Sequence, residues 1–156
     1  ISEAELTEQR ATPSAPVKKA SRAPFPRRYR VLVVEDNSGN QQLVRILLKR
    51  LGCLASVAGS GFEALKMVER EPFDLILMDI GLPGIDGFET TRLIRSGIEH
   101  AKGTPIVAFS AHAGEAEKLR SEQEGMTDYL TKPVRLQDLS RLLASQFAGA
   151  EIGDGK

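Results

Sequence analysis

The sequence has no tryptophan and few aromatic residues of any kind, so a folded core must be built mainly from aliphatic side chains. Cys53 is the only cysteine, which excludes a disulfide within the chain and favours a reducing compartment. No run approaches the ~18 consecutive apolar residues of a membrane span, and the N-terminus lacks the pattern of a signal peptide. We therefore expect a cytoplasmic chain that does not itself insert into a membrane.

Net charge is also absent, because 21 basic and 21 acidic side chains cancel. The balance gives no general argument for a nucleic acid partner, and we expect none to bind directly. The charge is uneven along the chain, because residues 1–30 carry seven basic and three acidic side chains, and residues 1–28 contain four prolines and few large apolar residues. We interpret this segment as a disordered basic linker or tail. A folded domain is expected over 29–148, followed by a frayed C-terminus over 149–156. The first residue is Ile, which suggests a fragment of a longer protein.

Short apolar runs alternate with segments of helical periodicity along the expected domain. The runs lie at 30–34, 54–58, 75–78, 105–109 and 126–131. Strands and helices that alternate over short connections are typical of a parallel sheet with helices on both faces, so the pattern predicts an α/β fold.

Two of the expected helices are informative. The first begins after Asn37 and Ser38, which suit an N-cap, and its apolar positions are taken to be Leu43, Ile46, Leu47 and Leu51. The helix after the fourth run is mostly polar, with only Ala116 and Leu119 as apolar positions. We expect this fourth helix to be the most lightly anchored.

Polar residues follow four of the apolar runs at the points where the strands end: Glu35 and Asp36, then Asp79, Ser110 and Lys132. A lone aspartate here would more often be a helix cap. In a parallel sheet, however, the carboxyl ends of the strands converge on one edge, where ligands bind. Four coincidences of this kind favour a site.

The residue types at this edge suit phosphoryl transfer. Three crowded carboxylates repel one another unless a cation is bound, and hard oxygen ligands select Mg²⁺. A carboxylate beside such a cation can attack a phosphoryl group and form an acyl phosphate. A hydroxyl and an ammonium, here Ser110 and Lys132, can then hold the charged phosphoryl oxygens.

The chain resembles the receiver domain of two-component response regulators over residues 29–148. The resemblance rests on VLVVEDN at 31–37, LILMDIGLPGIDGFE at 75–89, PIVAFSA at 105–111 and DYLTKP at 128–133. It implies a flavodoxin-like (CheY-like) doubly wound (βα)5 fold, a five-stranded parallel sheet in the order 2-1-3-4-5 with helices on both faces.

The resemblance also implies a role for each site residue. Glu35 and Asp36 match the acid pair that holds Mg²⁺, and the backbone carbonyl of Gly81 completes the metal site together with Asp79. In the family, the aspartate at the place of Asp79 receives phosphoryl from a histidine kinase or a His-containing phosphotransfer domain.

By the same carry-over, Ser110 and Lys132 contact the phosphoryl group, and Tyr129 is the aromatic switch that packs inward when Ser110 moves. Phosphorylation is expected to bias a surface made from the fourth helix, the fifth strand and the fifth helix. The chain would then act as a phosphoacceptor signalling switch that catalyses its own phosphorylation, with a homodimer left open.

The runs EDNSGNQ, MDIGLPGIDGFE and GMTDYLTKP are most similar to receivers fused to hybrid sensor histidine kinases or serving in multistep phosphorelays. A parent chain of that kind could tether the domain to a membrane-bound kinase. Gly81 lies two positions after the acceptor and has no side chain to orient an attacking water. We therefore expect slow loss of the aspartyl phosphate, over minutes or longer.

Two functions other than a phosphoacceptor switch are compatible with parts of this pattern. Phosphohydrolases with an aspartyl nucleophile usually carry a second acid two residues on, where this chain has Gly81. A receiver that serves only as an interaction module, independent of phosphorylation, is the other alternative. An FMN site lacks its Ser/Thr-rich loop, and the glycines form no GxGxxG fingerprint for a dinucleotide.

Four further polar residues have ordinary structural explanations. His112 could carry phosphate or bind metal, but a lone histidine at a loop edge is more often a solvated surface residue. His100 lies in a polar connection, and Cys53 is expected to be a small, partly buried packing residue rather than a nucleophile. Asp86 is expected to cap the helix after Pro83 rather than bind metal.

Overall fold

The computed structural model describes residues 28–112 and 114–155. Five parallel strands form one sheet in the order β3-β2-β4-β5-β6, which is the predicted 2-1-3-4-5 order of a CheY-like fold. The strands are β2 (Arg30–Val34), β3 (Leu54–Ala58), β4 (Leu75–Asp79), β5 (Ile106–Ser110) and β6 (Asp128–Thr131). The central strand β4 is buried along its whole length.

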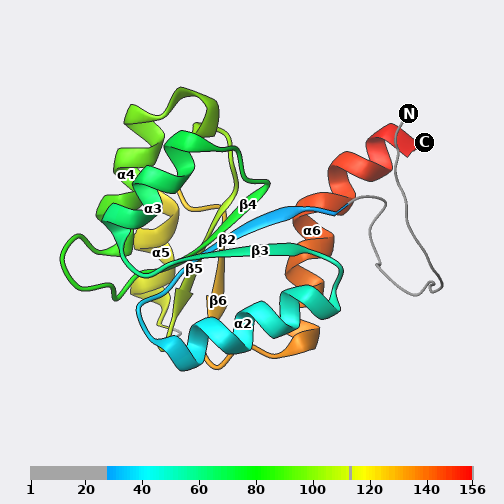
Figure 1. Cartoon of the computed structure of the whole chain (residues 1–156), viewed down its shortest axis with the longest axis horizontal. Helices are drawn as coiled ribbons and strands as arrows, with labels where there is room; N and C mark the ends of the chain where they lie inside the picture. The colour runs from blue at the N-terminus through cyan, green and yellow to red at the C-terminus, as the bar shows by residue number, and fades with distance from the viewer. Residues whose placement is uncertain (1–27, 113, 156) are drawn as a thin grey trace.

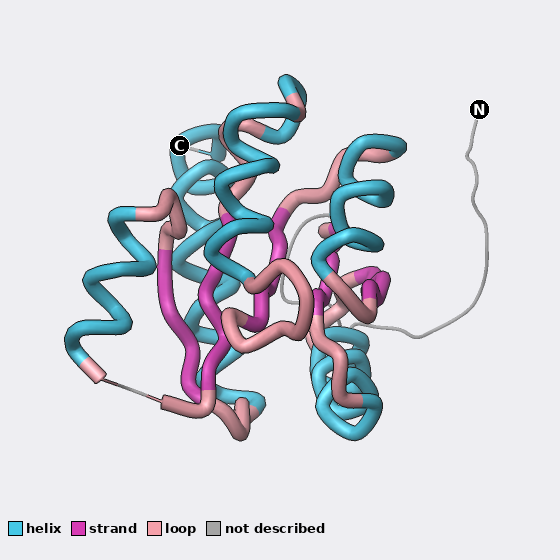
Figure 2. The backbone as a smooth tube through the Cα atoms, turned by 90° about the vertical axis from the view of Figure 1, so that its left-hand side faces the viewer, coloured by secondary structure: helices cyan, strands magenta, loops and turns pink. Residues whose placement is uncertain are grey.

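The helices cover both faces of the sheet, as predicted (Figure 1). On one face lie α2 (Ser38–Arg50) and α6 (Leu136–Gly155). On the other lie α3 (Gly61–Arg70), α4 (Gly87–Gly97) and α5 (Glu115–Gln123), with the short 3-10 helix η2 (Glu99–Ala101) after α4. Figure 2 shows the strands between these two groups of helices.

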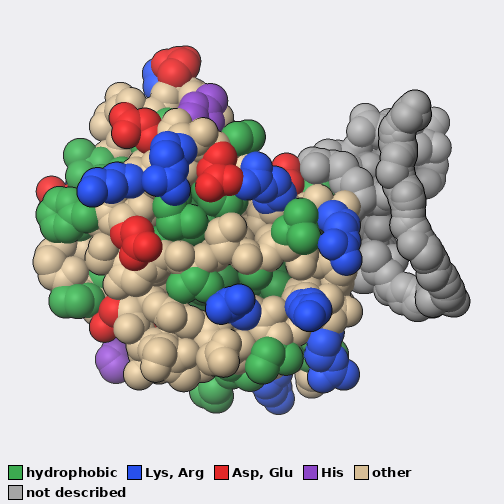
Figure 3. Space-filling view, viewed as in Figure 1, with side chains coloured by type: hydrophobic (Ala, Val, Ile, Leu, Met, Phe, Trp, Pro, Cys, Tyr) green, Lys and Arg blue, Asp and Glu red, His purple; other side chains and the backbone are tan. Residues whose placement is uncertain are grey.

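Each face of the sheet has its own apolar core. Alternate residues of one strand enter different cores, so Val31 and Val33 pack with α2 and α6, whereas Leu32 and Val34 pack with α3 and α4. Basic side chains are visible along α2 in Figure 3, and that helix carries Arg45, Lys49 and Arg50. No helix in the part of the chain that the structure describes is long and apolar enough to cross a membrane.

The predicted N-cap of α2 is confirmed, since the Asn37 side chain accepts a hydrogen bond from the amide of Asn40. The predicted apolar stripe was partly wrong. Leu43 and Ile46 are exposed, by 37% and 54%, and the buried positions are instead Val44, Leu47, Leu48 and Leu51. Both stripes have helical spacing, and only the second one continues along the face that meets the sheet.

The two last helices agree with expectation only in part. The light anchoring predicted for α5 is confirmed, but Leu119 is 56% exposed, and Ser121 is the only buried residue of this helix. Helix α6 runs to Gly155, so the frayed end expected from 149 is helical in the structure. The predicted linker lies almost wholly outside the described residues. Tyr29, the expected first ordered residue, is buried and stacks on Phe147 of α6.

Candidate functional site

The structure brings the predicted site residues together at the carboxyl edge of the sheet. Glu35 and Asp36 follow β2, Asp79 and Ser110 end β4 and β5, and Lys132 follows β6. With Gly81, these residues line one open depression of about 390 Å³. The strand register aligns the carboxyl ends of β4, β5 and β6, because Asp79 pairs with Phe109 and Ser110 pairs with Thr131.

Lys132 joins two of the acids across this edge. Its Nζ lies 2.8 Å from Glu35 Oε1 and 3.0 Å from Asp79 Oδ2, and the lysine side chain is only 17% exposed. Burial acts to lower the pKa of Lys132, but the Glu35 and Asp79 carboxylates outweigh it, so the pKa is raised. The ammonium therefore keeps its charge at neutral pH and lies where negative charge gathers.

Glu35, Asp36 and Asp79 form an acidic cluster in which one oxygen of each side chain lies within 4.8 Å of the others. Glu35 Oε2 accepts a hydrogen bond from the Asn37 amide at 3.0 Å. Glu35 Oε1 is buried and has no hydrogen bond from any described residue, although the Lys132 ammonium lies close to it as an ion-pair partner. A buried carboxylate oxygen with a free lone pair, beside two further carboxylates, fits a hard divalent cation such as Mg²⁺.

Asp79 is held by groups on both sides. Its Oδ1 accepts from the Gly81 amide at 2.9 Å, and its Oδ2 accepts from Lys132. A Cβ at position 81 would lie 3.6 Å from Asp79 Oδ1, so position 81 faces the Asp79 carboxylate.

The role of Gly87, the first residue of α4, was not predicted from the sequence. A Cβ there would lie 2.4 Å from the backbone oxygen of Asp79, so only glycine lets α4 start this close to the site. Asp86 caps this helix as predicted, accepting from the Glu89 amide at 2.9 Å. The run Asp86–Gly87 before a helix indicated a start but not this close approach.

Glu117, in the first turn of α5, was not predicted to belong to the site either. One oxygen of its carboxylate, Oε1, accepts from the Ser110 hydroxyl at 2.9 Å and from the Tyr129 hydroxyl at 2.6 Å. Tyr129 also contacts the carbonyl of His112, whose amide donates to Ser110 Oγ at 3.1 Å. Glu117 had no signal in the sequence, because an acid on a polar helix is ordinary.

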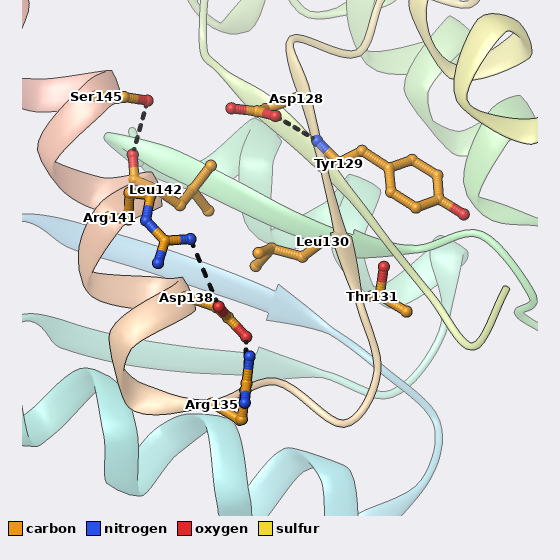
Figure 4. Close-up of a pocket in the computed structure, with 9 residues that line it drawn as sticks. All are labelled: Asp128, Tyr129, Leu130, Thr131, Arg135, Asp138, Arg141, Leu142 and Ser145. Atoms are coloured by element: carbon orange, nitrogen blue, oxygen red, sulfur yellow. Dashed lines mark hydrogen bonds and ion pairs between the residues drawn. The ribbon is translucent and has the colours of Figure 1, made fainter. Parts of the chain in front are cut away.

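The hydroxyl of Tyr129 remains protonated in this arrangement. Burial, and then the neighbouring Glu117 carboxylate, raise the pKa of the Tyr129 phenol, which the Ser110 contact lowers in part. The phenol is therefore a hydrogen-bond donor at neutral pH. Figure 4 shows its ring turned away from α6.

A second depression, of about 500 Å³, lies between β6 and α6 (Figure 4). Its charged side chains pair largely with one another, since Asp138 lies 3.1 Å from Arg135 and 3.6 Å from Arg141. Neither the acidic cluster nor Lys132 lines it. The depression at the carboxyl edge of the sheet is therefore the better candidate for chemistry.

The remaining polar residues are placed as follows. His112 is exposed and lines the candidate site. Nε2 of His100 lies 2.7 Å from the Val68 carbonyl, and His100 does not line the candidate site. Cys53 is buried, as expected, and burial raises the pKa of its thiol to about 11.

Comparison with curated proteins identifies sensor histidine kinases as relatives. The chain is 40% identical over 140 residues to the sensor histidine kinase GacS of Pseudomonas protegens, covering 88% of this chain and 15% of that protein. It is 37% identical over 122 residues to the signal transduction histidine-protein kinase BarA of Escherichia coli K12, covering 78% of this chain and 13% of that protein. The chain thus spans only a small part of these relatives.

Solved structures show the same fold. The receiver domain of the sensor histidine kinase PA1611 from Pseudomonas aeruginosa PAO1, solved with magnesium coordinated in its active site cleft, is 37% identical. The match has a TM-score of 0.71 and covers 76% of this chain and 97% of that domain. The chemotaxis protein CheY4 of Vibrio cholerae matches with 28% identity and a TM-score of 0.73, over 77% of this chain and 99% of that one.

The family model for the response regulator receiver domain matches residues 31–144, which include every candidate site residue described above. Family model, relatives and solved structures agree with the resemblance seen in the sequence. The chain belongs to the response regulator receiver domains of two-component signalling systems.

Proposed function

We propose that this receiver is a phosphoacceptor switch in which Asp79 takes a phosphoryl group from a phosphohistidine. The observation that carries the proposal is the position of Lys132, whose ammonium contacts Asp79 and Glu35 together inside an acidic cluster. A structural ion pair would need one carboxylate. Three carboxylates and one ammonium leave excess negative charge that a divalent cation would balance.

The chemical step follows from the contacts of Asp79. A carboxylate oxygen of Asp79 attacks phosphorus, the P–N bond of the donor phosphohistidine breaks, and the bonding electrons leave with the imidazole nitrogen. The Gly81 amide and the Lys132 ammonium orient the carboxylate, one at each oxygen. The product is an acyl phosphate on Asp79.

The neighbouring residues hold the transferred group. Lys132 lies close enough to turn from the Asp79 carboxylate to a phosphoryl oxygen, and the Ser110 hydroxyl lines the same depression from the end of the neighbouring strand β5. Glu35, Asp36, Asp79 and the Gly81 carbonyl would hold Mg²⁺, which would withdraw charge from the phosphoryl oxygens.

Position 81 governs the lifetime of the phosphorylated state in this account. A side chain there would lie beside Asp79 Oδ1, where it could orient an attacking water, and glycine leaves that place without a polar group. We expect phospho-Asp79 to persist for minutes or longer, and Gly81→Asn to shorten its half-life.

The donor is proposed to be a histidine kinase or a His-containing phosphotransfer domain. The similarity to the receiver portions of GacS and BarA supports a place in a hybrid kinase or a multistep phosphorelay. Domains outside this chain, or partner proteins, would then supply the phosphoryl group and read the switch.

Intact mass spectrometry tests the proposal. The chain is incubated with acetyl phosphate, with and without Mg²⁺, beside Asp79→Asn and the remote control Asp138→Asn on α6. One added phosphoryl group is expected in the wild type and in Asp138→Asn only when Mg²⁺ is present, and it should be released by hydroxylamine. An equal adduct in Asp79→Asn would contradict the assignment of the acceptor. If no variant gains a phosphoryl group from acetyl phosphate or from a phosphorylated phosphotransfer domain, the chain is an interaction-only receiver.

A further inference from the structure

Glu117 connects the proposed phosphoryl site to α5 through a single oxygen atom. The hydroxyls of Ser110 and Tyr129 both donate to Glu117 Oε1, at 2.9 and 2.6 Å. The Ser110 hydroxyl has one hydrogen, so while it is donated to Glu117 it is unavailable to a phosphoryl group on Asp79. Glu117 also lines the same depression as Asp79 and Lys132.

Among the described residues, few other side chains hold this end of α5. Glu117 is half-buried, whereas its neighbours Glu115, Ala116, Lys118 and Leu119 are exposed. The N-cap residue Gly114 makes no side-chain capping hydrogen bond. In this turn the Lys118 ammonium lies 6.0 Å from the centre of the Tyr129 ring, and the hydrogen bonds to β5 and β6 are those of Glu117.

We propose that Glu117 is a positioning residue that holds the Ser110 hydroxyl in the resting domain and is displaced from it when Asp79 is phosphorylated. The inference rests on the proposed function, and it adds the residue through which the phosphoryl group acts on α5. No role for this position was predicted from the sequence.

Two physical effects drive the exchange in the same direction. A phosphoryl oxygen competes with Glu117 for the one hydroxyl hydrogen of Ser110, and it carries a comparable or greater negative charge. The added charge also repels the Glu117 carboxylate across a shared depression. Tyr129 shares the same acceptor atom, so movement of Glu117 would leave its hydroxyl with the His112 carbonyl as its remaining partner.

Beryllofluoride with Mg²⁺, a stable mimic of the phosphoryl group, provides the test. Its affinity is measured by isothermal titration calorimetry for the wild type, Glu117→Gln, Glu117→Ala and Glu115→Gln. Glu117→Gln keeps an acceptor of the same size but removes the charge, whereas Glu117→Ala removes the acceptor as well. Glu115→Gln makes the same charge change on the same helical turn, at an exposed residue without these contacts.

We expect both Glu117 variants to bind beryllofluoride about five-fold or more tightly than the wild type, which is the lower end of ordinary coupling between sites. Glu115→Gln should stay within about two-fold of the wild type, because exposed charges are screened. Equal affinity in all four proteins overturns the inference and leaves the proposed function intact. No binding by any of them, with no phosphoryl adduct, overturns both.

A second measurement tests the resting contact without any ligand. The phenol of Tyr129 is titrated by ultraviolet absorbance in a Tyr29→Phe background. Because the Glu117 carboxylate helps to raise the pKa of this phenol, Glu117→Gln should lower the pKa and Glu115→Gln should not. An unchanged pKa in Glu117→Gln would show that the contact is absent in solution, which also overturns the inference. A purely structural role would alter thermal unfolding without this selective change in the phenol.

Discussion

Helices α4 and α5 lie on the same face of the sheet, yet they are held there in different ways. Helix α4 buries five residues, including Phe88 and Ile94, and starts against the backbone of Asp79. Helix α5 buries only Ser121. Apolar burial therefore anchors α4, and some other interaction must hold α5.

Polar contacts at both ends of α5 supply that interaction. Glu117 in its first turn contacts Ser110 and Tyr129, and Glu124 just after its last turn pairs with Arg92 of α4 at 2.7 Å. Arg120 lies 4.2 Å from the centre of the Phe88 ring. Because a polar contact contributes only about 1 kcal/mol net, such contacts can be exchanged for others at small cost.

The difference indicates where a signal based on charge can act. A phosphoryl group on Asp79 would change the electrostatics around Glu117 without disturbing an apolar core. We therefore assign the movable surface to α5 and β6, and a fixed role to α4.

The largest effect should come from truncating the apolar anchor of α4. Ile94 is fully buried, so Ile94→Ala should lower the free energy of unfolding by about 2–5 kcal/mol. The matched change in α5, Leu119→Ala, removes an exposed side chain and should cost less than about 0.5 kcal/mol. Urea unfolding measures both values. Similar losses in the two variants would show that apolar burial anchors α5 as strongly as α4.

An intermediate effect is expected at Arg95, which links α4 to the turn after α5. Its guanidinium donates to the carbonyls of Gly125, Ala101, Lys102 and Thr104, and the Gly125 contact is 2.8 Å long. Arg95→Met keeps an apolar stem but leaves these carbonyls without their donor.

We expect Arg95→Met to lower the free energy of unfolding by about 1–3 kcal/mol, the range for charged hydrogen bonds. Arg141→Met on the exposed face of α6 is the control and should change it by less than about 0.5 kcal/mol. Urea unfolding again gives the values. Equal effects of the two substitutions would mean that Arg95 does not hold the end of α5.

The smallest effect concerns the two N-caps. The side chain of Asp86 caps α4, whereas Gly114 gives α5 no side-chain cap. Gly114→Asn should stabilise α5 by a few tenths of a kcal/mol, and Asp86→Gly should destabilise α4 by a similar amount. Thermal unfolding followed by circular dichroism compares the two. A loss of stability in Gly114→Asn would show that the start of α5 is already fixed by other contacts.

Much of the fold was predictable because local patterns and tertiary packing agree. Apolar runs such as Arg30–Val34 are short, β-branched and buried on both faces, which few other structures accommodate. The choice between Leu43 and Val44 as core residues was not predictable, since two overlapping stripes of helical spacing occur on α2. Only contact with the sheet and α6 distinguishes them.

The site was predictable where it depends on strand ends alone. Parallel strands bring Glu35, Asp79 and Lys132 to one edge whatever the details of the loops. Glu117 and Gly87 were not predictable, because their contacts depend on where a loop places the following helix. Glu117 reaches Ser110 and Tyr129 only because α5 starts over the edge of β5 and β6.

The most direct test of a movable α5 beside a fixed α4 is hydrogen exchange followed by mass spectrometry. It compares the same chain before and after phosphorylation with acetyl phosphate and Mg²⁺. The account predicts one phosphoryl group on the peptide that contains Asp79. It also predicts faster exchange in α5 (Glu115–Gln123), with exchange in α4 (Gly87–Gly97) unchanged. A phosphorylated chain in which α5 exchanges as before, or in which α4 changes as much as α5, would contradict the account.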